Sequence, residues 1–277
     1  MVTLTRTITI CWIALAATAW SMPGQAADRF ITLASTTSTE NSGLFEHMLP
    51  QFEAETGIAV RVIAVGTGQA MRLGQNGDAD LLLVHHRPSE ERFVAEGYGK
   101  VRYDVMYNDF IVVGPSADPA GITGFDSVAG AFGRIAVTQA TFASRGDDSG
   151  TNKAEIGIWG QAGVDPTGAS GDWYRELGAG MGATLNTASA MQAYTLTDRA
   201  TWLAFENPGE LTILVEGDPV LFNQYGVIPI NVDRHPHVKY EDAGRLVDWL
   251  LSPAGQGAIA AFRLRDTQVF FPNAGAG

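Results

Sequence analysis

The segment Arg145-Gly146-Asp147-Asp148-Ser149-Gly150-Thr151-Asn152-Lys153-Ala154-Glu155 combines one guanidinium with small, hydroxyl-bearing and glycine residues. It leads directly into a stretch that can form a helix, 152–161. The free backbone N–H groups of a helix start and a fixed positive charge therefore converge on one point, which favours binding of an anion. The candidate ligands within the segment are Arg145, Ser149 and Thr151.

A second hydroxyl-rich segment, Ser35-Thr36-Thr37-Ser38-Thr39-Glu40-Asn41-Ser42-Gly43, follows an apolar run and precedes a helix-like stretch, 44–55. One hydroxyl would suffice to cap that helix, which is the alternative interpretation. Five consecutive hydroxyl residues precede Glu40, so we expect the additional donors to serve a ligand. Two such strand-to-helix junctions predict two lobes that close on one small oxyanion.

The first 26 residues have the pattern of a secretory signal peptide. Arg6 is their only charge, 8–20 is mostly apolar, and Gly24-Gln25-Ala26 provides small residues for cleavage. The single cysteine, Cys11, lies in the apolar run and lacks the Leu-x-x-Cys context of a lipoprotein. We therefore expect a mature protein without disulfides, free in the periplasm.

The net negative charge of the chain excludes some classes of binding partner. The chain has 18 basic and 30 acidic residues and a formal charge of −12, and loss of a signal peptide with one arginine and no acid would make it −13. Such a surface argues against nucleic acid and anionic membranes. It does not argue against an anion ligand, because charges beyond about 10 Å are screened and a buried site depends on its local donors.

Strand-like and helix-like segments alternate through the first third of the chain. Unalternated apolar runs such as Leu81-Leu82-Leu83-Val84 are typical of parallel strands that are covered on both faces. Ligands of such sheets lie at the carboxyl ends of the strands, where 35–41, 66–68 and 85–87 fall. The Gly66-Thr67-Gly68 turn suits close approach of a ligand, with an ordinary tight turn as the alternative. The expected strands are 30–35, 59–65 and 79–84, and the expected helices are 44–55, 69–73 and 89–96.

Two long extended runs, 101–114 and 223–232, each have the length to leave one lobe and enter another. Between them we expect a second α/β block with strands 133–138 and 211–216 and helices 152–161, 173–180 and 189–195. Helices 240–251 and 253–262 should then return to the first lobe. The predicted fold is α/β, with two lobes joined by a two-strand hinge: lobe I from 27–110 and 228–277, and lobe II from 111–227.

Several alternatives concern the same residues. Arg145 could form an ordinary ion pair with Asp147 or Asp148, and 147–155 lacks the spacing of a calcium loop. His85-His86, His235-Pro236-His237 and His47 lack companion ligands at metal-site spacing, so a structural or exposed role is expected. An exported hydrolase with Ser38 or Ser149 as nucleophile would need a base, and no histidine is near either in sequence.

Six stretches together resemble the tungstate-binding proteins of bacterial ABC importers, the TupA type, over essentially the whole mature chain. The resemblance implies a type II periplasmic binding protein that is not an enzyme and needs no cofactor. It would capture tungstate in the interlobe cleft and deliver it, as a monomer, to an ABC permease and its ATPase. The matching stretches are 35–44, 65–70, 79–85, 107–115, 145–155 and 193–199.

The resemblance also implies positions for the ligand-binding residues. The family's Thr-Thr-Thr-Ser motif falls on Ser35-Thr36-Thr37-Ser38, its site arginine on Arg145 and a site threonine on Thr151. Tungstate carries no proton at neutral pH, so donors alone should hold it, whereas phosphate could use Asp147 as an acceptor. Molybdate and phosphate remain alternative ligands, and whether Tyr194 and Asp198 reach the cleft stays open. The implied ligand-binding set is Thr36, Thr37, Ser38, Thr67, Arg145, Ser149 and Thr151, with no metal cation.

Overall fold

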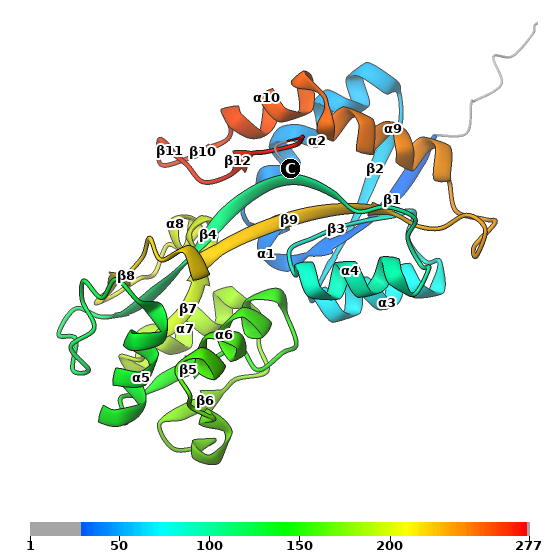
Figure 1. Cartoon of the computed structure of the whole chain (residues 1–277). Helices are drawn as coiled ribbons and strands as arrows, with labels where there is room; N and C mark the ends of the chain where they lie inside the picture. Colours follow the sequence, from blue (N-terminus) through cyan, green and yellow to red (C-terminus); the bar gives the residue numbers. More distant parts are fainter. Residues whose placement is uncertain (1–28, 276–277) are drawn as a thin grey trace, which may run out of the picture.

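A parallel set of strands forms the centre of lobe I in the computed structural model, which describes residues 29–275 (Figure 1). Strand β1 (Phe30–Thr36) pairs in parallel with both β2 (Ala59–Val65) and β3 (Leu81–Val84). All four residues of β3 are buried, as expected for a strand covered on both faces. The signal-peptide prediction for 1–26 lies outside the described residues.

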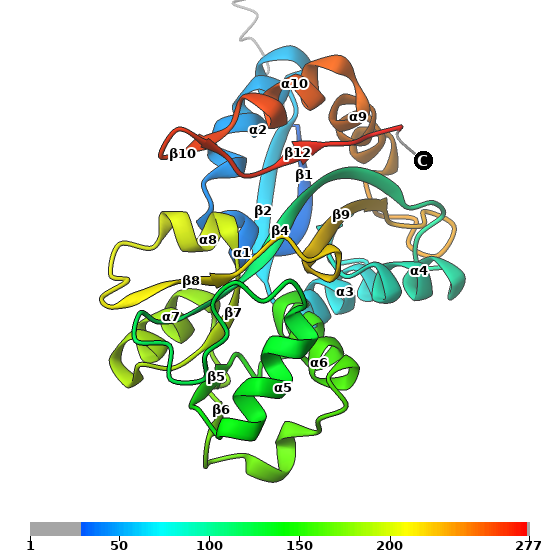
Figure 2. The ribbon, with the colours of Figure 1, turned by 60° about the vertical axis from the view of Figure 1, so that its left-hand side comes forward.

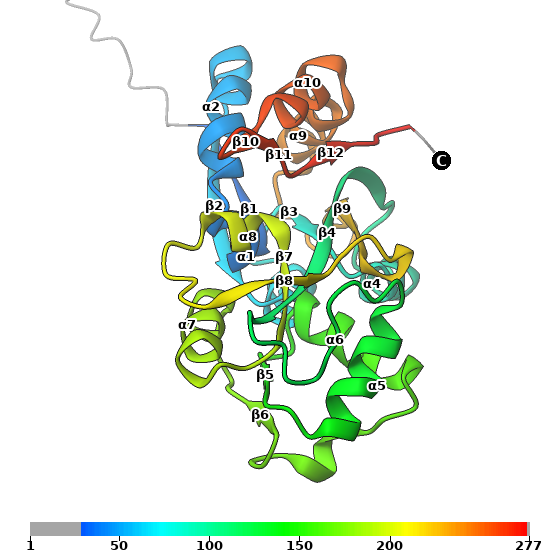
Figure 3. The same cartoon turned by 90° about the vertical axis from the view of Figure 1, so that its left-hand side faces the viewer.

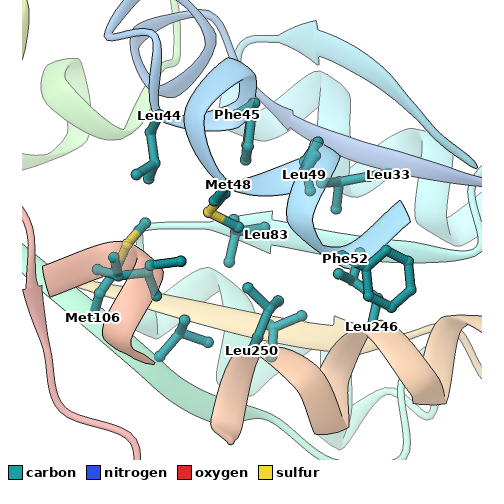
Figure 4. Packing of buried hydrophobic residues seen from close by; sticks show 14 of the residues in the cluster. Leu33, Leu44, Phe45, Met48, Leu49, Phe52, Leu83, Met106, Leu246 and Leu250 are labelled. Carbon is teal, nitrogen blue, oxygen red and sulfur yellow. The ribbon is translucent and has the colours of Figure 1, made fainter. Parts of the chain in front are cut away.

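Helices cover both faces of this sheet. On one face α2 (Leu44–Thr56), α9 (Tyr240–Leu251) and α10 (Pro253–Ala261) enclose a core with the sheet. Figure 4 shows Met48 and Phe52 of α2 facing Leu246 and Leu250 of α9. The C-terminal helices thus complete lobe I from the far end of the chain. The other face carries α3 (Thr67–Asn76) and α4 (Arg87–Ala95), which pack on a second core.

Two long antiparallel strands connect the lobes. Strand β4 (Tyr103–Pro115) has 13 residues and pairs with β9 (Phe222–Pro229) in its first half. Its second half pairs with β7 (Thr195–Asp198) and β8 (Leu211–Val215) of lobe II. Figure 2 shows β4 and β9 running between the two lobes. The two extended runs therefore form the hinge, while the residue boundaries at 110 and 228 remain a prediction.

Lobe II has its own hydrophobic core, built around Trp159, Phe142 and Tyr174. Figure 3 shows its helices gathered around short strands below the crossing strands. No helix within 29–275 is long and apolar enough to cross a bilayer. The remaining elements are α1 (Thr37–Asn41), α5 (Val128–Thr138), β5 (Phe142–Ser144), α6 (Gly150–Gln161), η1 (Pro166–Ala169), β6 (Tyr174–Glu176), α7 (Met181–Met191), α8 (Arg199–Ala204), η2 (Pro219–Leu221), β10 (Arg263–Leu264), β11 (Thr267–Gln268) and β12 (Phe271–Pro272).

The strand predicted at 133–138 is wrong, because these residues end helix α5. Val128, Ala131, Phe132 and Ile135 are buried at helical spacing, and Ser127 caps the helix by accepting a hydrogen bond from the backbone of residue 130. The helical spacing of the apolar residues can be recognised only when the sequence is considered from the capping residue Ser127 onward. The short apolar stretch at the end of the helix resembles a strand when it is considered alone.

Two predicted helices of lobe II are also wrong. The 173–180 segment contains strand β6, because Tyr174 pairs in parallel with Phe142 of β5. The 189–195 helix ends early: α7 stops at Met191, Gln192 takes a left-handed conformation (φ 51°), and Thr195 begins β7. Both errors come from pairing with distant strands, since a single short segment does not reveal its partner.

Candidate anion-binding site

The carboxyl ends of the three parallel strands bring Ser38, Thr67 and His85 together in lobe I. Ser38 lies in α1 directly after β1, and its Oγ is 3.5 Å from Nε2 of His85. Thr67 is the first residue of α3, after Gly66, and is fully buried. The topology of the sheet therefore gathers the three segments that the sequence places at strand ends.

The start of helix α6 faces this cluster from lobe II. Ser149 caps the helix, and Gly150 and Thr151 follow in its first turn. A Cβ added to Gly150 would lie 2.7 Å from Cε1 of His85 and 3.2 Å from Oγ1 of Thr67. The N-termini of α3 and α6 thus meet across the cleft, with the lobes closed on each other. Both helix starts direct partial positive charge at one place.

Two hydroxyl groups at this meeting point have no partner. Thr67 Oγ1 and Thr151 Oγ1 are buried and make no hydrogen bond within 29–275. A buried polar group without a hydrogen bond is rare, because it loses its hydration without compensation. The two orphan hydroxyls come from opposite lobes, so an oxygen-rich ligand held between the lobes would satisfy both.

Arg145 provides the positive charge of the site. The side chain is 3% exposed, and its Nη2 donates to Oδ2 of Asp147 at 2.5 Å. Burial lowers the pKa of His85, and the positive charge of Arg145 lowers it further. Burial raises the pKa of Asp198, and the charge of Arg145 opposes that rise. Asp147 holds Ser149 as well, because its other oxygen accepts from the Ser149 backbone N–H. The predicted ion pair is therefore present, and it orients the guanidinium.

Fewer hydroxyl groups of the 35–39 segment are free to bind a ligand than its composition predicts. Ser35 donates to the carbonyl of Leu83 at 2.6 Å, inside the sheet. Thr36 caps α1, with its Oγ1 2.8 Å from Oγ1 of Thr39. Thr37 is half-buried at the start of α1, and no described hydrogen bond of its side chain ties it to the cluster. Much of this hydroxyl content thus serves the local fold, and Ser38 is the member that reaches His85.

Ser149 likewise has a local partner. Its hydroxyl oxygen accepts from the backbone N–H of Asn152, which is the role of a helix cap. The structure therefore places Ser38 and Thr67 beside His85 in lobe I, Thr151 next to Gly150 at the facing start of α6, and Arg145 within electrostatic range of His85. It places Thr36, Thr37 and Ser149 on the segments that border the closed cleft.

His85 is the main residue that sequence reasoning missed at this site. The residue is 5% exposed, and its ring stacks on Tyr225, with 4.8 Å between the ring centroids. Its Nδ1 lies 3.1 Å from Oδ1 of Asn223, whose amide bonds to Asn108 on the other hinge strand at 2.6 Å. Burial lowers the pKa of His85 to about 4, so the ring is neutral at pH 7. Its position after β3 was a usable signal, but its hydrogen-bond partner Asn223 comes from the hinge strand β9.

The other candidate residues have structural roles. His47 and His237 each contact a backbone carbonyl, of Ala258 and Gly77 respectively. Tyr194 lies in the lobe II core and donates to Asp118, so it does not reach the cleft. Asp198 is buried and caps α8 through Thr201. Across 29–275, no group of three or more His, Cys, Asp or Glu side chains is arranged to hold a cation.

A cavity of about 320 Å³ adjoins the site between the lobes. His85 and Asn223 lie on one side of it, and Gly150 and Ala154 of α6 lie on the other. Residues of both lobes and of the hinge therefore line one space beside the orphan hydroxyls. A small anion has room to approach from this side.

Glu155 of helix α6 connects this helix to the segment that carries Arg145. Glu155 is 1% exposed, and its carboxyl group accepts hydrogen bonds from Ser144 and Tyr174, each at 2.8 Å, and from Trp159 at 3.2 Å. Ser144 directly precedes Arg145 in the chain. Burial raises the pKa of Glu155 to about 7 against the effect of these donors.

We expect Glu155→Gln to remove a pH dependence of stability. Between the ordinary pKa of 4.5 and the raised value of about 7, the folded protein keeps a proton that the unfolded chain has released. The stabilisation that Glu155 contributes through its bound proton is therefore greatest below pH 4.5. It falls by about 3 kcal/mol as the pH rises from 4.5 to 7, and it does not change further at higher pH. Denaturant unfolding of both proteins from pH 4.5 to 8 measures the difference, and parallel curves would contradict the assignment.

Comparison with known proteins shows what this chain is similar to. A family model described as a PBP superfamily domain matches residues 21–254. The tungstate-binding protein TupA of Peptoclostridium acidaminophilum is 46% identical over 248 residues, which cover 88% of this chain and 86% of that protein.

Two solved structures are similar over most of the chain. The tungstate-binding protein TupA from Desulfovibrio alaskensis G20 is 46% identical, with a TM-score of 0.77 over 89% of this chain and 99% of that one. The tungstate ABC transporter protein from Geobacter sulfurreducens is 47% identical, with a TM-score of 0.78 over 85% and 100% of the two chains.

Proposed function

Because the chain belongs to the PBP superfamily and, within it, to the family of the TupA tungstate-binding proteins, we propose that it binds tungstate between its lobes for delivery to an ABC transporter. The observation that carries this proposal is the pair of buried, unpartnered hydroxyls of Thr67 and Thr151 at the interlobe contact, among residues 29–275. A tetrahedral oxyanion has the acceptor oxygens that both require.

The chemistry of the surrounding groups supports a deprotonated dianion. Arg145, the hydroxyls and the N–H groups at the starts of α3 and α6 are all donors. Each hydrogen bond to a charged oxygen is worth about 1.5 to 3 kcal/mol net. Six or seven of them, offset by closure and desolvation, give about −12 kcal/mol, which is nanomolar affinity. The proposed ligand-binding residues are Thr36, Thr37, Ser38, Thr67, Arg145, Ser149 and Thr151.

Phosphate is the weaker candidate ligand. Hydrogen phosphate carries a proton at neutral pH and gains from an acceptor carboxylate in its site. Asp147 is the carboxylate that could serve as this acceptor, and each of its oxygens already accepts one hydrogen bond, from Arg145 and from the Ser149 backbone. Molybdate has the charge and shape of tungstate and is the second candidate.

The structure places a histidine beside Ser38, but the surroundings of that histidine do not suit the general base of a hydrolase. His85 lies next to Ser38 in space, although 47 residues separate them in sequence. The partner of its Nδ1 is the neutral Asn223, and the ring is buried with a pKa near 4. A general base needs a pKa near the working pH to accept the proton of a nucleophile. The family to which the chain belongs consists of solute-binding proteins.

The proposal extends to the place and partners of the protein. Export by the segment 1–26 would put the chain in the periplasm. There it would act as a monomer and present the loaded, closed form to a membrane permease with its ATPase. A permease can recognise the closed form because closure sets the relative position of the two lobes, which β4 and β9 join.

A thermal melt tests the ligand assignment. The chain from residue 27 onward would be heated alone and with tungstate, molybdate, phosphate or sulfate. Ligand at 100 to 1,000 times its dissociation constant adds about 2.7 to 4.1 kcal/mol, so the midpoint should rise by several degrees. We expect a large rise with tungstate, a rise with molybdate, and none with phosphate or sulfate. A rise with phosphate alone would transfer the assignment to phosphate, and none at all would refute anion transport.

Replacement of Thr151 by valine separates binding from folding. Valine keeps the shape of threonine and removes the orphan hydroxyl. We expect tungstate affinity to fall about tenfold, because one hydrogen bond to a charged oxygen is lost. The ligand-free protein should melt no lower than wild type, because no internal hydrogen bond is broken. Thr187→Val on α7, where the hydroxyl bonds only to the Ala183 carbonyl, is the control and should bind normally.

A further inference from the structure

Asn152, in the first turn of helix α6, bonds to both ends of the segment that carries Arg145. Its Oδ1 accepts from the backbone N–H of Asp148 at 3.2 Å, and its Nδ2 donates to Oγ of Ser144 at 3.4 Å. A backbone N–H can only donate, so the Asp148 contact fixes the orientation of the amide, with its nitrogen toward Ser144. One side chain therefore ties residues 144 and 148 to the helix, and Arg145 lies between them.

The backbone of this segment needs support from outside. It lies between β5 and α6, and Gly146 and Asp148 both have left-handed conformations, with φ of 57° and 59°. Glycine adopts this conformation readily, but a residue with a Cβ adopts it at a cost in energy. The N–H that Asn152 binds is that of Asp148, and Lys153 donates to the Asp148 carbonyl at 2.7 Å. The start of α6 therefore supports the segment at its least favourable residue.

Ser144 gives the other end of the segment a fixed place. It is fully buried, and its hydroxyl donates to Glu155 at 2.8 Å while it accepts from Asn152. Asn152 and Glu155 are three residues apart on α6 and so lie on the same side of the helix. Both anchors of the segment thus belong to the helix that presents Thr151.

The guanidinium of Arg145 is held in an orientation that leaves one nitrogen for a ligand. Within residues 29–275 its Nε donates to the Ala179 carbonyl at 3.4 Å and its Nη2 to Asp147 at 2.5 Å, while Nη1 makes no hydrogen bond. These partners all belong to lobe II, so the arrangement does not depend on closure of the cleft. A donor that is already in place loses less conformational entropy when a ligand binds.

We propose that Asn152 is a positioning residue of the anion site: by tying Ser144 and Asp148 to the first turn of α6, it fixes Arg145 relative to Thr151 before the ligand arrives. The inference rests on the proposed function and deepens it, because it makes lobe II a preformed half of the site. Asn152 acts through Arg145 in this role, since both ends of its amide bond to the Arg145 segment.

Nitrogen NMR relaxation of the arginine side chains tests the inference and needs no variant of Asn152. The Nε–H signal of Arg145 is assigned by its loss in Arg145→Ala. In the ligand-free wild type we expect this group to have an order parameter like that of rigid backbone, about 0.85. A value below about 0.6, which is typical of flexible groups, would overturn the inference because Arg145 would not be held in advance.

A double-mutant cycle of tungstate affinities supplies a second readout. Asn152→Ala should bind tungstate about tenfold more weakly than wild type, because Arg145 must then be ordered when the ligand binds. In the Arg145→Ala background the same substitution should change the affinity by less than about twofold, because no guanidinium remains to be positioned. Equal losses in the two backgrounds would contradict the inference, since a purely structural role of Asn152 would not depend on Arg145.

The matched control is Asn186→Ala on helix α7 of the same lobe. The Asn186 amide donates to the Gly182 carbonyl of its own helix. This variant should bind tungstate as wild type does and leave the order parameter of Arg145 unchanged, whereas Asn152→Ala should lower it.

The outcomes separate the two proposals. If wild-type protein does not bind tungstate, the proposed function fails and this inference fails with it. If wild type binds tungstate but Asn152→Ala, folded by its melting curve, binds equally well, only the inference fails. If Asn152→Ala does not fold, the order parameter of Arg145 in the wild type decides the inference by itself.

Discussion

Arg145→Ala is expected to weaken tungstate binding by about 10²- to 10³-fold while the ligand-free protein keeps its fold. Removing one partner of a buried, charge-assisted contact costs about 2 to 5 kcal/mol, and here the ligand would lose the only full positive charge that the described cluster directs at it. The remaining contacts of the side chain are with Asp147 and, at 3.4 Å, with the Ala179 carbonyl, so few internal bonds are lost. Isothermal titration with tungstate measures the loss.

The matched control is Arg263→Ala. This arginine is exposed and donates only to carbonyls of its own segment, at Ala260 and Phe262. The control should bind tungstate as wild type does, which separates the local role of Arg145 from the general effect of removing one positive charge. Wild-type affinity in the Arg145 variant would mean that the guanidinium serves Asp147 alone.

Gly150→Ala is expected to weaken tungstate binding by about 100-fold because it obstructs closure. The new methyl group would lie 2.7 Å from His85 Cε1 and 2.9 Å from Nδ1, and that ring is backed by Tyr225. Overpacking of this kind costs about 1 to 3 kcal/mol. Gly150 starts helix α6 with an ordinary backbone conformation, so alanine is not strained in an open form. Scattering with and without tungstate would show a loss of compaction to match the loss of affinity.

The same helix supplies the control. Gly157 lies inside α6, and a Cβ added there meets nothing within 4 Å. Gly157→Ala should bind tungstate normally and raise the free energy of unfolding by about 0.5 to 1 kcal/mol, because alanine loses less backbone entropy in a helix. Equal affinities of the two alanine variants would show that the contact between Gly150 and His85 does not limit closure.

The sequence predicted lobe I well because its signals are local. Strand β2 matches the predicted 59–65, and helix α9 matches 240–251, since each has a full period of apolar residues between turn residues. The two extended runs, 101–114 and 223–232, identified the hinge by their length. The donor-rich ends of β1 and β2 and the Arg145 segment were found because composition alone marks them.

The remaining features depend on partners that are distant in sequence. Strand β6 forms because Tyr174 pairs with Phe142, and the Ser35 hydroxyl does not serve the site because it donates a hydrogen bond to the Leu83 carbonyl. The surroundings of His85 depend on a pairing register that places its hydrogen-bond partner Asn223 opposite Asn108 across the hinge. No local pattern encodes that register, and the sequence predicted a structural or exposed role for His85.

The core of lobe I joins the two ends of the chain, and this determines the order in which the protein can assemble. Glu55 and Trp249 form a hydrogen bond across 194 residues, and α2 packs against α9 and α10. Lobe II lies entirely between those ends, so its core can form as soon as β8 and β9 are available, whereas the lobe begun first is finished last. Such long-range closure slows folding. A chain in which α9 and α10 have not yet packed would therefore have a folded lobe II and a lobe I sheet with one hydrophobic face exposed. In that state the exposed face would favour aggregation.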